Sequence, residues 1–184
     1  LSSWASPWAP YHMAQKGVLK IEGALSFIRE NVNACEESSF LLTHSGAEAS
    51  VLVLNSIEKK ARNEGKKLHI VASLSERLPL MHAFTTLKQR YDARIDLLPV
   101  GPKGFIEKES LEQKVTQETS LVMLPFIDPF SGVLQPLDDL GSFLKSLSVP
   151  LSLDVTPALK KIPLSFQELD ADYVTFDARL LGSP

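Results

Sequence analysis

The residues with the clearest capacity for chemistry lie where a short apolar run meets a helix-forming pattern. Apolar residues 40–42 lead into Thr43-His44-Ser45-Gly46-Ala47-Glu48, after which apolar residues recur at helical spacing. This order predicts a strand, a tight turn and the start of a helix. Because the first N–H groups of a helix are unpaired and lie at the positive end of its dipole, such a turn suits a bound phosphate. A well-capped strand-to-helix connection without a ligand would have the same sequence features.

Three aspartates, Asp128, Asp154 and Asp177, lie at the ends of later apolar runs. These runs are predicted strands, and the ligands of an open α/β sheet bind beyond the carboxyl ends of its strands. We therefore expect the three carboxylates at the edge of the sheet where a ligand would bind. Asp154 has a second interpretation, in which its carboxylate only caps the turn that follows its strand.

The elements that must position these residues follow from the alternation of apolar runs and helical patterns. Strands are predicted at residues 40–42, 68–72, 95–100, 120–126, 150–155 and 171–176, and helices at 21–32, 48–64, 78–91, 110–116 and 136–146. This alternation predicts an α/β protein with a doubly wound, mainly parallel sheet.

The domain organisation is predicted to be simple. Residues 1–20 are expected to form an N-terminal arm and residues 21–184 one large domain, because no internal repeat or low-complexity linker separates the later elements. The arm contains Trp4 and Trp8, which would contact either a partner subunit or their own domain, since exposed Trp is costly. The chain lacks an initiator Met and stops abruptly at Pro184, so we expect it to be a fragment of a longer protein.

Composition limits the classes of protein and of compartment. With 44% hydrophobic and 22% charged residues the chain can bury a core, and its net charge of −3 argues against a general nucleic-acid binder. No apolar run reaches the length of about 20 residues that spans a bilayer, and no signal peptide is visible. The single cysteine, Cys35, suits a reducing compartment such as the cytoplasm, and its acidic neighbours Glu36 and Glu37 favour a structural thiol. No metal site is predicted.

Five motifs, in this order, resemble those of a known family. They are residues 43–49 (similar to T-S-G-G-T-E-A), 69–77 (a strand ending in Glu-His), 132–136 (G-T-I-Q-P), 153–163 (V-D-A-A-Q-S-A-G-K-L-P) and 172–184 (D-L-M-S-I-S-G-H-K-I-Y-G-P). The family is that of the class V aminotransferase-like enzymes, which use pyridoxal phosphate (PLP), and within it the NifS-type cysteine desulfurases. The resemblance covers about residues 27–184. It implies the major domain of a fold type I PLP transferase, PLP as cofactor, and a homodimer whose sites are built from both subunits.

The lysine that would form a Schiff base with PLP falls on Leu180, and the family's preceding His falls on Arg179. A leucine has no amine, so no internal aldimine forms there. Shifting the alignment by one position places Arg179 or Leu181 at the lysine position, which supplies no lysine either. The resemblance therefore implies the family's fold without its central catalytic group.

The ring-binding positions are also changed. The family's stacking His falls on Arg77; an arginine can lie over a π-face as a cation but cannot shuttle protons near neutral pH. The Gln that binds the ring oxygen falls on Pro157, and the family's Asn pair falls on about Asp128 and Pro129. Asp154 matches the acid that pairs with the pyridinium nitrogen.

The phosphate-binding positions are changed as well. The family's Thr falls on Ala47, which loses a hydroxyl donor, while Gly46, Ala47 and Glu48 keep their backbone N–H groups. The family's Ser near the lysine falls on Asp177, whose carboxylate would repel a phosphate dianion. The cofactor-binding candidates are therefore Gly46, Ala47, Arg77, Asp154 and Asp177, and no residue is a confident catalytic candidate.

Two functions are compatible with these residues. The first is a non-catalytic or scaffold homologue that keeps the PLP fold for dimerisation or for binding a protein partner. The second is an active PLP-dependent desulfurase-like enzyme completed by segments outside this chain. A Rossmann-type nucleotide binder is a third possibility, but the turn around Gly46 contains one Gly where the G-x-G-x-x-G motif requires three.

Overall fold

The structure is a computed structural model that describes residue 6 and residues 9–181. The chain consists of two compact units. The smaller unit comprises residues 1–41 and 164–168, and the larger comprises residues 42–163 and 169–184. All the strands of the described chain, and all the candidate site residues, belong to the larger unit.

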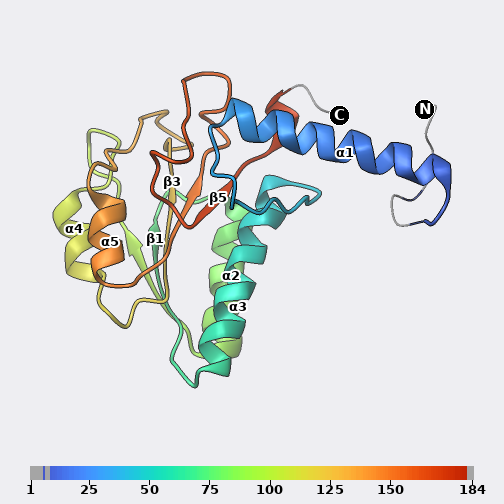
Figure 1. The fold of residues 1–184 in the computed structure, drawn as a ribbon. Coiled ribbons are helices and arrows are strands. Elements are labelled where there is room, and N and C mark those ends of the chain that lie inside the picture. Colours follow the sequence, from blue (N-terminus) through green and yellow to red (C-terminus); the bar gives the residue numbers. More distant parts are fainter. Residues whose placement is uncertain (1–5, 7–8, 182–184) are drawn as a thin grey trace. The chain divides into compact units, whose positions relative to one another are not determined.

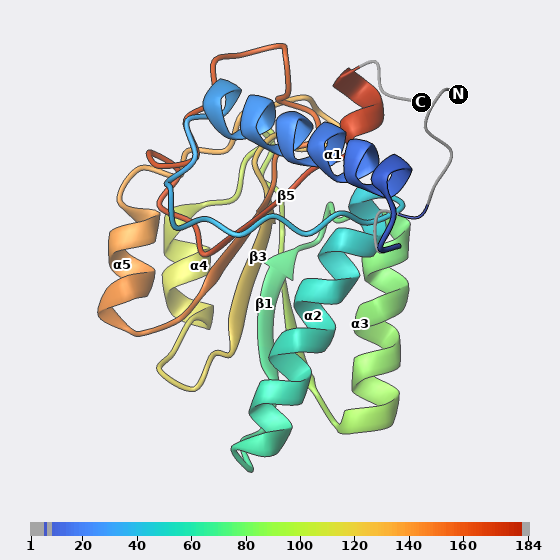
Figure 2. The ribbon, with the colours of Figure 1, turned by 45° about the vertical axis from the view of Figure 1, so that its right-hand side comes forward.

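The larger unit is a parallel sheet with helices on both faces. Its elements are α2 (Gly46–Asn63), β1 (His69–Ser73), α3 (Leu78–Tyr91), β2 (Arg94–Leu98), α4 (Lys108–Lys114), β3 (Leu121–Pro125), α5 (Leu140–Ser146), β4 (Leu151–Asp154), β5 (Tyr173–Thr175) and the 3₁₀ turn η1 (Ala178–Leu181). The strands pair in the order β2-β1-β3-β4-β5, all parallel. Figures 1 and 2 show α2 and α3 on one face and α4 and α5 on the other. The predicted doubly wound α/β class is confirmed.

The strand order reverses between β1 and β3, which lie side by side although α3, β2 and α4 separate them in the chain. In open α/β sheets such a reversal opens a crevice at the carboxyl ends of the strands. Every residue of β1 and of β3 is buried, because helices cover both faces. The segments that follow these two strands therefore border this crevice.

The core beneath α2 and α3 is built from alternating strand residues. Ile70 and Ala72 of β1 and Leu121 and Met123 of β3 belong to one buried apolar cluster with both helices. The helix residues in this cluster are Leu54, Ile57, Ala61, Leu80, Phe84 and Leu87. This packing fixes the first turn of α2, which begins beside the carboxyl ends of the strands (Figure 2).

The start of α2 is stabilised by its own sequence. The Ser45 hydroxyl accepts a hydrogen bond from the N–H of Glu48 (3.2 Å), and the Glu48 carboxylate accepts one from the N–H of His44 (2.6 Å). The Ser45 bond satisfies an N–H group that the helix start would otherwise leave free. The Glu48 bond differs from that of a capping box, because it reaches the residue before the N-cap Ser45 and not Ser45 itself. At the other end of the helix, Gly65 has a φ of +65°, as expected for a glycine that terminates a helix.

The smaller unit contains α1 (His12–Asn31) and a loop that Arg29 organises. The Arg29 guanidinium donates to the carbonyl oxygens of Cys35 (2.9 Å), Glu36 (2.6 Å) and Ser38 (3.1 Å). The loop thus holds Cys35, which is a free and exposed thiol. None of the described helices combines the length and the apolar character needed to span a membrane.

Some predicted elements were wrong at their ends or entirely. Residues 40–42 form no strand; Leu41 and Leu42 are 76% and 62% exposed, so this run gains no burial from pairing. The helix predicted at 21–32 begins at His12, and the one predicted at 136–146 begins only at Leu140, because Asp139 has a left-handed φ of +63°. Trp4 and Trp8 lie outside the described residues.

Candidate functional site

Asp154 ends β4 at the carboxyl edge of the sheet and has two partners. Its Oδ1 accepts a hydrogen bond from the N–H of Thr156 (2.8 Å), which caps the turn after the strand. Its Oδ2 lies 3.4 Å from a guanidinium nitrogen of Arg77. Oδ1 of Asp154 therefore caps the turn, as one of the two interpretations expected, whereas Oδ2 faces a cation.

Arg77 reaches Asp154 from the segment between β1 and α3, where it is the N-cap residue of α3. The Arg77 side chain is 39% exposed and the Asp154 side chain 15% exposed. In the family resemblance the first of these positions stacks on a bound PLP ring and the second pairs with the ring nitrogen. Here they contact each other, so the oxygen of Asp154 that would pair with a pyridinium nitrogen is already paired with a guanidinium.

Glu76, beside Arg77, is the most perturbed carboxyl group of this edge. Glu76 is only 5% exposed, and its Oε1 has no hydrogen-bond partner among the described residues. Burial raises the pKa of Glu76 to about 8, the negative charges of Asp154 and Asp128 add to this, and Arg77 opposes it. Glu76 is therefore mostly protonated at neutral pH. Sequence reasoning did not select it, although an acid three residues after a fully buried strand was the available signal.

Asp128 holds the loop that follows β3. Its Oδ1 accepts hydrogen bonds from the N–H groups of Phe130 (3.1 Å) and Ser131 (2.7 Å) and from the Ser131 hydroxyl (2.8 Å). Burial acts to raise the pKa of Asp128, but hydrogen bonds from Ser75, Ser131 and Phe130 outweigh it, so the pKa lies below its ordinary value. This carboxylate shapes a loop, and it lies at the same edge as Asp154, as predicted.

Asp177, after β5, meets the first turn of α2. Its Oδ2 accepts a long hydrogen bond from the N–H of Gly46 (3.5 Å), and the Arg179 side chain donates to both of its oxygens through Nε (2.9 and 3.1 Å). These Arg179 hydrogen bonds, with the backbone N–H groups of Arg179 and Gly46, hold the pKa of Asp177 well below its usual range. Asp177 is therefore an anion at the start of α2. Ala47, the next residue of that turn, is half-buried.

Close packing joins the end of β5 to α2 around this carboxylate. A Cβ placed on Gly46 would lie 3.2 Å from the Cβ of Asp177. The hydroxyls of Ser50 and Thr175 are 3.1 Å apart, and the Thr156 hydroxyl accepts a hydrogen bond from the N–H of Asp177 (3.1 Å). Gly46 and Asp177 are therefore too close together to admit another group between them.

These residues do not fit PLP as the family resemblance would place it. An anion already lies at the start of α2, where the phosphate would bind, and Arg77 pairs with the carboxylate that would face the ring nitrogen. The backbone of Leu180 lies in η1, and a leucine brings no amine to that position. Within the described residues, no group of three or more His, Cys, Asp or Glu side chains is placed to bind a metal ion.

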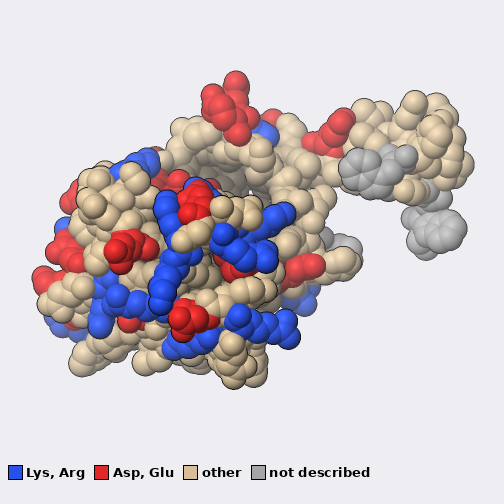
Figure 3. Space-filling view, turned by 90° about the horizontal axis from the view of Figure 1, so that it is seen from below, with Lys and Arg blue, Asp and Glu red and all other residues tan. Residues whose placement is uncertain are grey.

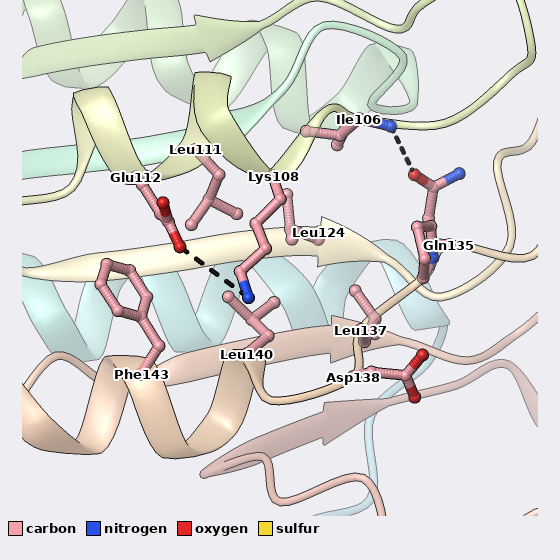
Figure 4. A pocket seen from close by; sticks show the side chains of 11 residues that line it. Ile106, Lys108, Leu111, Glu112, Leu124, Gln135, Leu137, Asp138, Leu140 and Phe143 are labelled. Atoms are coloured by element: carbon pink, nitrogen blue, oxygen red, sulfur yellow. Dashed lines mark hydrogen bonds and ion pairs between the residues drawn. The ribbon is translucent and has the colours of Figure 1, made fainter.

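A pocket between α4 and α5 offers no comparable chemistry. Figure 4 shows it lined mainly by apolar side chains, with the Lys108–Glu112 ion pair (3.9 Å) at its side. The buried Gln135 amide at its end is fully used, because it accepts from the N–H of Ile106 (3.0 Å) and donates to the carbonyl of Gly104 (3.1 Å). Gln135 thus joins the backbone of residues 104–106 to that of Val133, to whose carbonyl it also donates (3.3 Å).

At the opposite edge of the sheet, Lys and Arg side chains lie among Asp and Glu side chains (Figure 3), and residues of this edge line a hollow. Its lining includes Lys67 and Arg94, which pair with Asp92 (3.5 Å) and Asp96 (2.7 Å). His69, at the amino end of β1, also contacts Asp96, at 3.0 Å. The cations of this hollow are thus largely balanced by neighbouring acids.

Comparisons with known proteins agree with this fold. Residues 5–183 match the family described as Aminotransferase class-V. The chain therefore belongs to the class V aminotransferase family, whose members include PLP-dependent cysteine desulfurases. Its resemblance to the NifS-type branch of that family is confirmed.

Individual relatives support the same assignment. The chain is 29% identical over 164 residues to "Cysteine desulfurase IscS" of Rickettsia typhi, covering 89% of this chain and 39% of that protein. Among solved structures it is similar to a "NIFS-LIKE PROTEIN" (TM-score 0.90, 22% identity, 99% of this chain and 49% of that one). It is also similar to "SspA in complex with cysteine" (TM-score 0.89, 21% identity, 99% of this chain and 51% of that one). The chain thus spans about two fifths of the length of the curated relative and half of the solved ones.

Proposed function

We propose that this chain is a cysteine desulfurase-like member of the class V family that has lost Schiff-base chemistry and acts as a non-catalytic or scaffold homologue. The observation that most favours this is the Asp177 carboxylate at the start of α2, held there by Arg179. PLP, when bound, supplies an aldehyde for amine capture and a phosphate for anchoring. Leu180 has no amine to react with the aldehyde, and the negative charge of Asp177 would repel the phosphate.

The Arg77–Asp154 pair supports the same proposal. An acid that faces a pyridinium nitrogen stabilises the positive charge on that nitrogen and makes the ring an electron sink. Asp154 instead stabilises the guanidinium of Arg77, at 3.4 Å. A ring entering this site would have to displace that cation, and the buried Glu76 carboxyl beside it would lose a compensating charge.

The test of lost chemistry uses PLP and the chain as it stands. After incubation with PLP and removal of the excess, we expect no visible aldimine band and no borohydride-fixed adduct in the intact mass. We also expect no sulfide release from cysteine, with an active class V cysteine desulfurase as the positive control. A stoichiometric adduct that peptide mass mapping assigns to one lysine would contradict the proposal and favour the active enzyme completed by other segments. Adducts spread over several surface lysines would only reflect nonspecific amine chemistry.

We further propose that the protein is a cytoplasmic homodimer and that, as a scaffold, it binds a protein partner. The support is family membership together with the single thiol of the sequence, Cys35. Trp4 and Trp8 are the proposed dimer contacts, since large aromatics are favoured at interfaces. Sedimentation velocity tests this: the double substitution Trp4→Ala and Trp8→Ala should shift the protein toward monomer. An unchanged sedimentation coefficient would argue against these two residues as contacts.

A further inference from the structure

We infer that Asp177 is a built-in anion that replaces a bound phosphate at the start of α2 and fastens the end of β5 to that helix. The inference rests on the proposed loss of the cofactor, and it identifies what the chain uses in the place of the cofactor's phosphate. A latent anion site follows from it, because removing the carboxylate would leave the groups that now bind it without a partner.

The groups around Asp177 are those that a phosphate requires. The N–H of Gly46 points to Oδ2 from the positive end of an 18-residue helix. The Arg179 guanidinium donates to both oxygens, and fork-shaped contacts of this kind suit carboxylates and phosphates equally. A helix N-terminus and an arginine together form a site for negative charge, and the chain fills it from within.

The carboxylate is fixed in this site by its own backbone. The N–H of Asp177 donates to the Thr156 hydroxyl (3.1 Å), and the N–H of Arg179 donates to Oδ1 of Asp177 (3.1 Å). The Asp177 side chain is only 10% exposed, whereas that of Arg179 is 67% exposed. The anion is thus held inside while its cation lies at the opening, so Arg179 would remain available to an anion from solution if Asp177 were shortened.

A serine at position 177 is the informative substitution, because the family resemblance places a phosphate-binding serine there. Asp177→Ser removes the negative charge and leaves a hydroxyl, the N–H of Gly46 and the Arg179 guanidinium around the vacated volume. Arg179→Gln is the matched control. It breaks the same ion pair but leaves the carboxylate at the start of α2, where that carboxylate still repels an incoming phosphate.

The experiment measures thermal unfolding of the chain by far-UV circular dichroism, with and without inorganic phosphate, at neutral pH and constant ionic strength set with chloride. The wild type should show no phosphate-dependent shift of its midpoint. Asp177→Ser should unfold at a lower temperature without phosphate and gain about 3 °C or more with it. Arg179→Gln should also unfold at a lower temperature, but phosphate should not raise its midpoint.

Three results would overturn the inference: a phosphate-dependent rise in the wild type, an equal rise in Arg179→Gln, or a folded Asp177→Ser variant that ignores phosphate. If Asp177→Ser does not fold, Asp177→Ala replaces it, since alanine removes the charge and also vacates the volume of the carboxylate. A phosphate response of Asp177→Ala then supports the inference and its absence overturns it. The proposed function fails by a different readout, a lysine-linked PLP adduct in the wild type.

Discussion

The guanidinium of Arg77 lies 3.4 Å from Oδ2 of Asp154, across the carboxyl edge of the sheet from β1 to β4. The pair joins the segment after β1 to the end of a strand that is not its neighbour, since β3 lies between them. Opposite charges within this distance stabilise each other, and more strongly when they are partly shielded from water. The two residues thereby link the segment after β1 to the end of β4 at this edge of the sheet.

Arg77→Met should destabilise the larger unit, because it leaves the Asp154 carboxylate, 15% exposed, without its cation. Since Arg77 itself is partly exposed, we expect a loss of about 1 kcal/mol in the free energy of unfolding by urea at neutral pH. Lys67→Met is the matched control: it breaks an ion pair whose side chains are 90% and 93% exposed, and the urea midpoint should not move. Equal effects of the two substitutions would show that the Arg77 pair is no more than a surface contact.

Glu76 should make the protein less stable as the pH rises. Its pKa is raised from 4.5 to about 8 in the folded chain. Below pH 4.5 the carboxyl is protonated in both the folded and unfolded states and contributes no difference. Between 4.5 and 8 the unfolded chain releases this proton while the folded chain keeps it, so the free energy of unfolding falls. The fall is on the order of 5 kcal/mol at most, and it ends above about pH 8.

Glu76→Gln isolates this contribution, because the amide keeps the shape of the protonated acid and does not titrate. Urea unfolding measured across the pH range should show the variant gaining stability over the wild type as the pH rises from 5 to 8. The difference should be smallest at the acid end. Asp177 contributes with the opposite sign, since its lowered pKa adds stability that is lost only as the pH falls below the ordinary range of an aspartate. Parallel curves for wild type and Glu76→Gln would contradict the assignment of a buried neutral acid.

Most of this fold could be predicted from sequence, because burial on both faces leaves continuous apolar runs. The strand predicted at residues 68–72 is β1 shifted by one residue, and the helix predicted at 78–91 is α3 with the same bounds. Residues 40–42 show where this kind of prediction fails. Three apolar residues have the composition of a strand, but they form one only when they pair with a neighbouring strand. The helix α1 was predicted nine residues too short at its start, since no single residue marks its beginning at His12.

The candidate site was harder to predict than the fold. The Asp177 position was selected, and its repulsion of a phosphate follows from charge alone, but the sequence does not show that Arg179 neutralises it. Glu76 was missed, because its raised pKa depends on burial and on Asp154 and Asp128, which come from distant parts of the chain. Residue types indicate which groups are present, whereas pKa values depend on which groups the fold brings together.

Asp128 provides a third test, directed at the loop after β3. Asp128→Ala removes the acceptor of three hydrogen bonds, from two backbone N–H groups and one hydroxyl of residues 130–131. Because these donors lose their buried partner, we expect a loss of about 2–3 kcal/mol in the free energy of unfolding. Asp128→Asn keeps the Oδ1 acceptor and should lose clearly less. Equal losses for Ala and Asn would mean that charge, and not hydrogen bonding, holds this loop.

Gly46→Ala tests how closely α2 approaches the end of β5. A Cβ at residue 46 would lie 3.2 Å from the Cβ and 3.3 Å from the backbone nitrogen of Asp177. The backbone nitrogen is itself bonded to the Thr156 hydroxyl, so neither atom moves away easily. We expect a loss of about 1–3 kcal/mol in the free energy of unfolding, typical of an overpacked contact.

Gly23→Ala is the control, because a Cβ at Gly23, inside α1, meets nothing within 4 Å. Since alanine is the better helix former, Gly23→Ala should leave the stability unchanged or raise it slightly. A Gly46→Ala variant as stable as Gly23→Ala would show that the end of β5 yields to α2, and the tight junction at Asp177 described above would then be wrong.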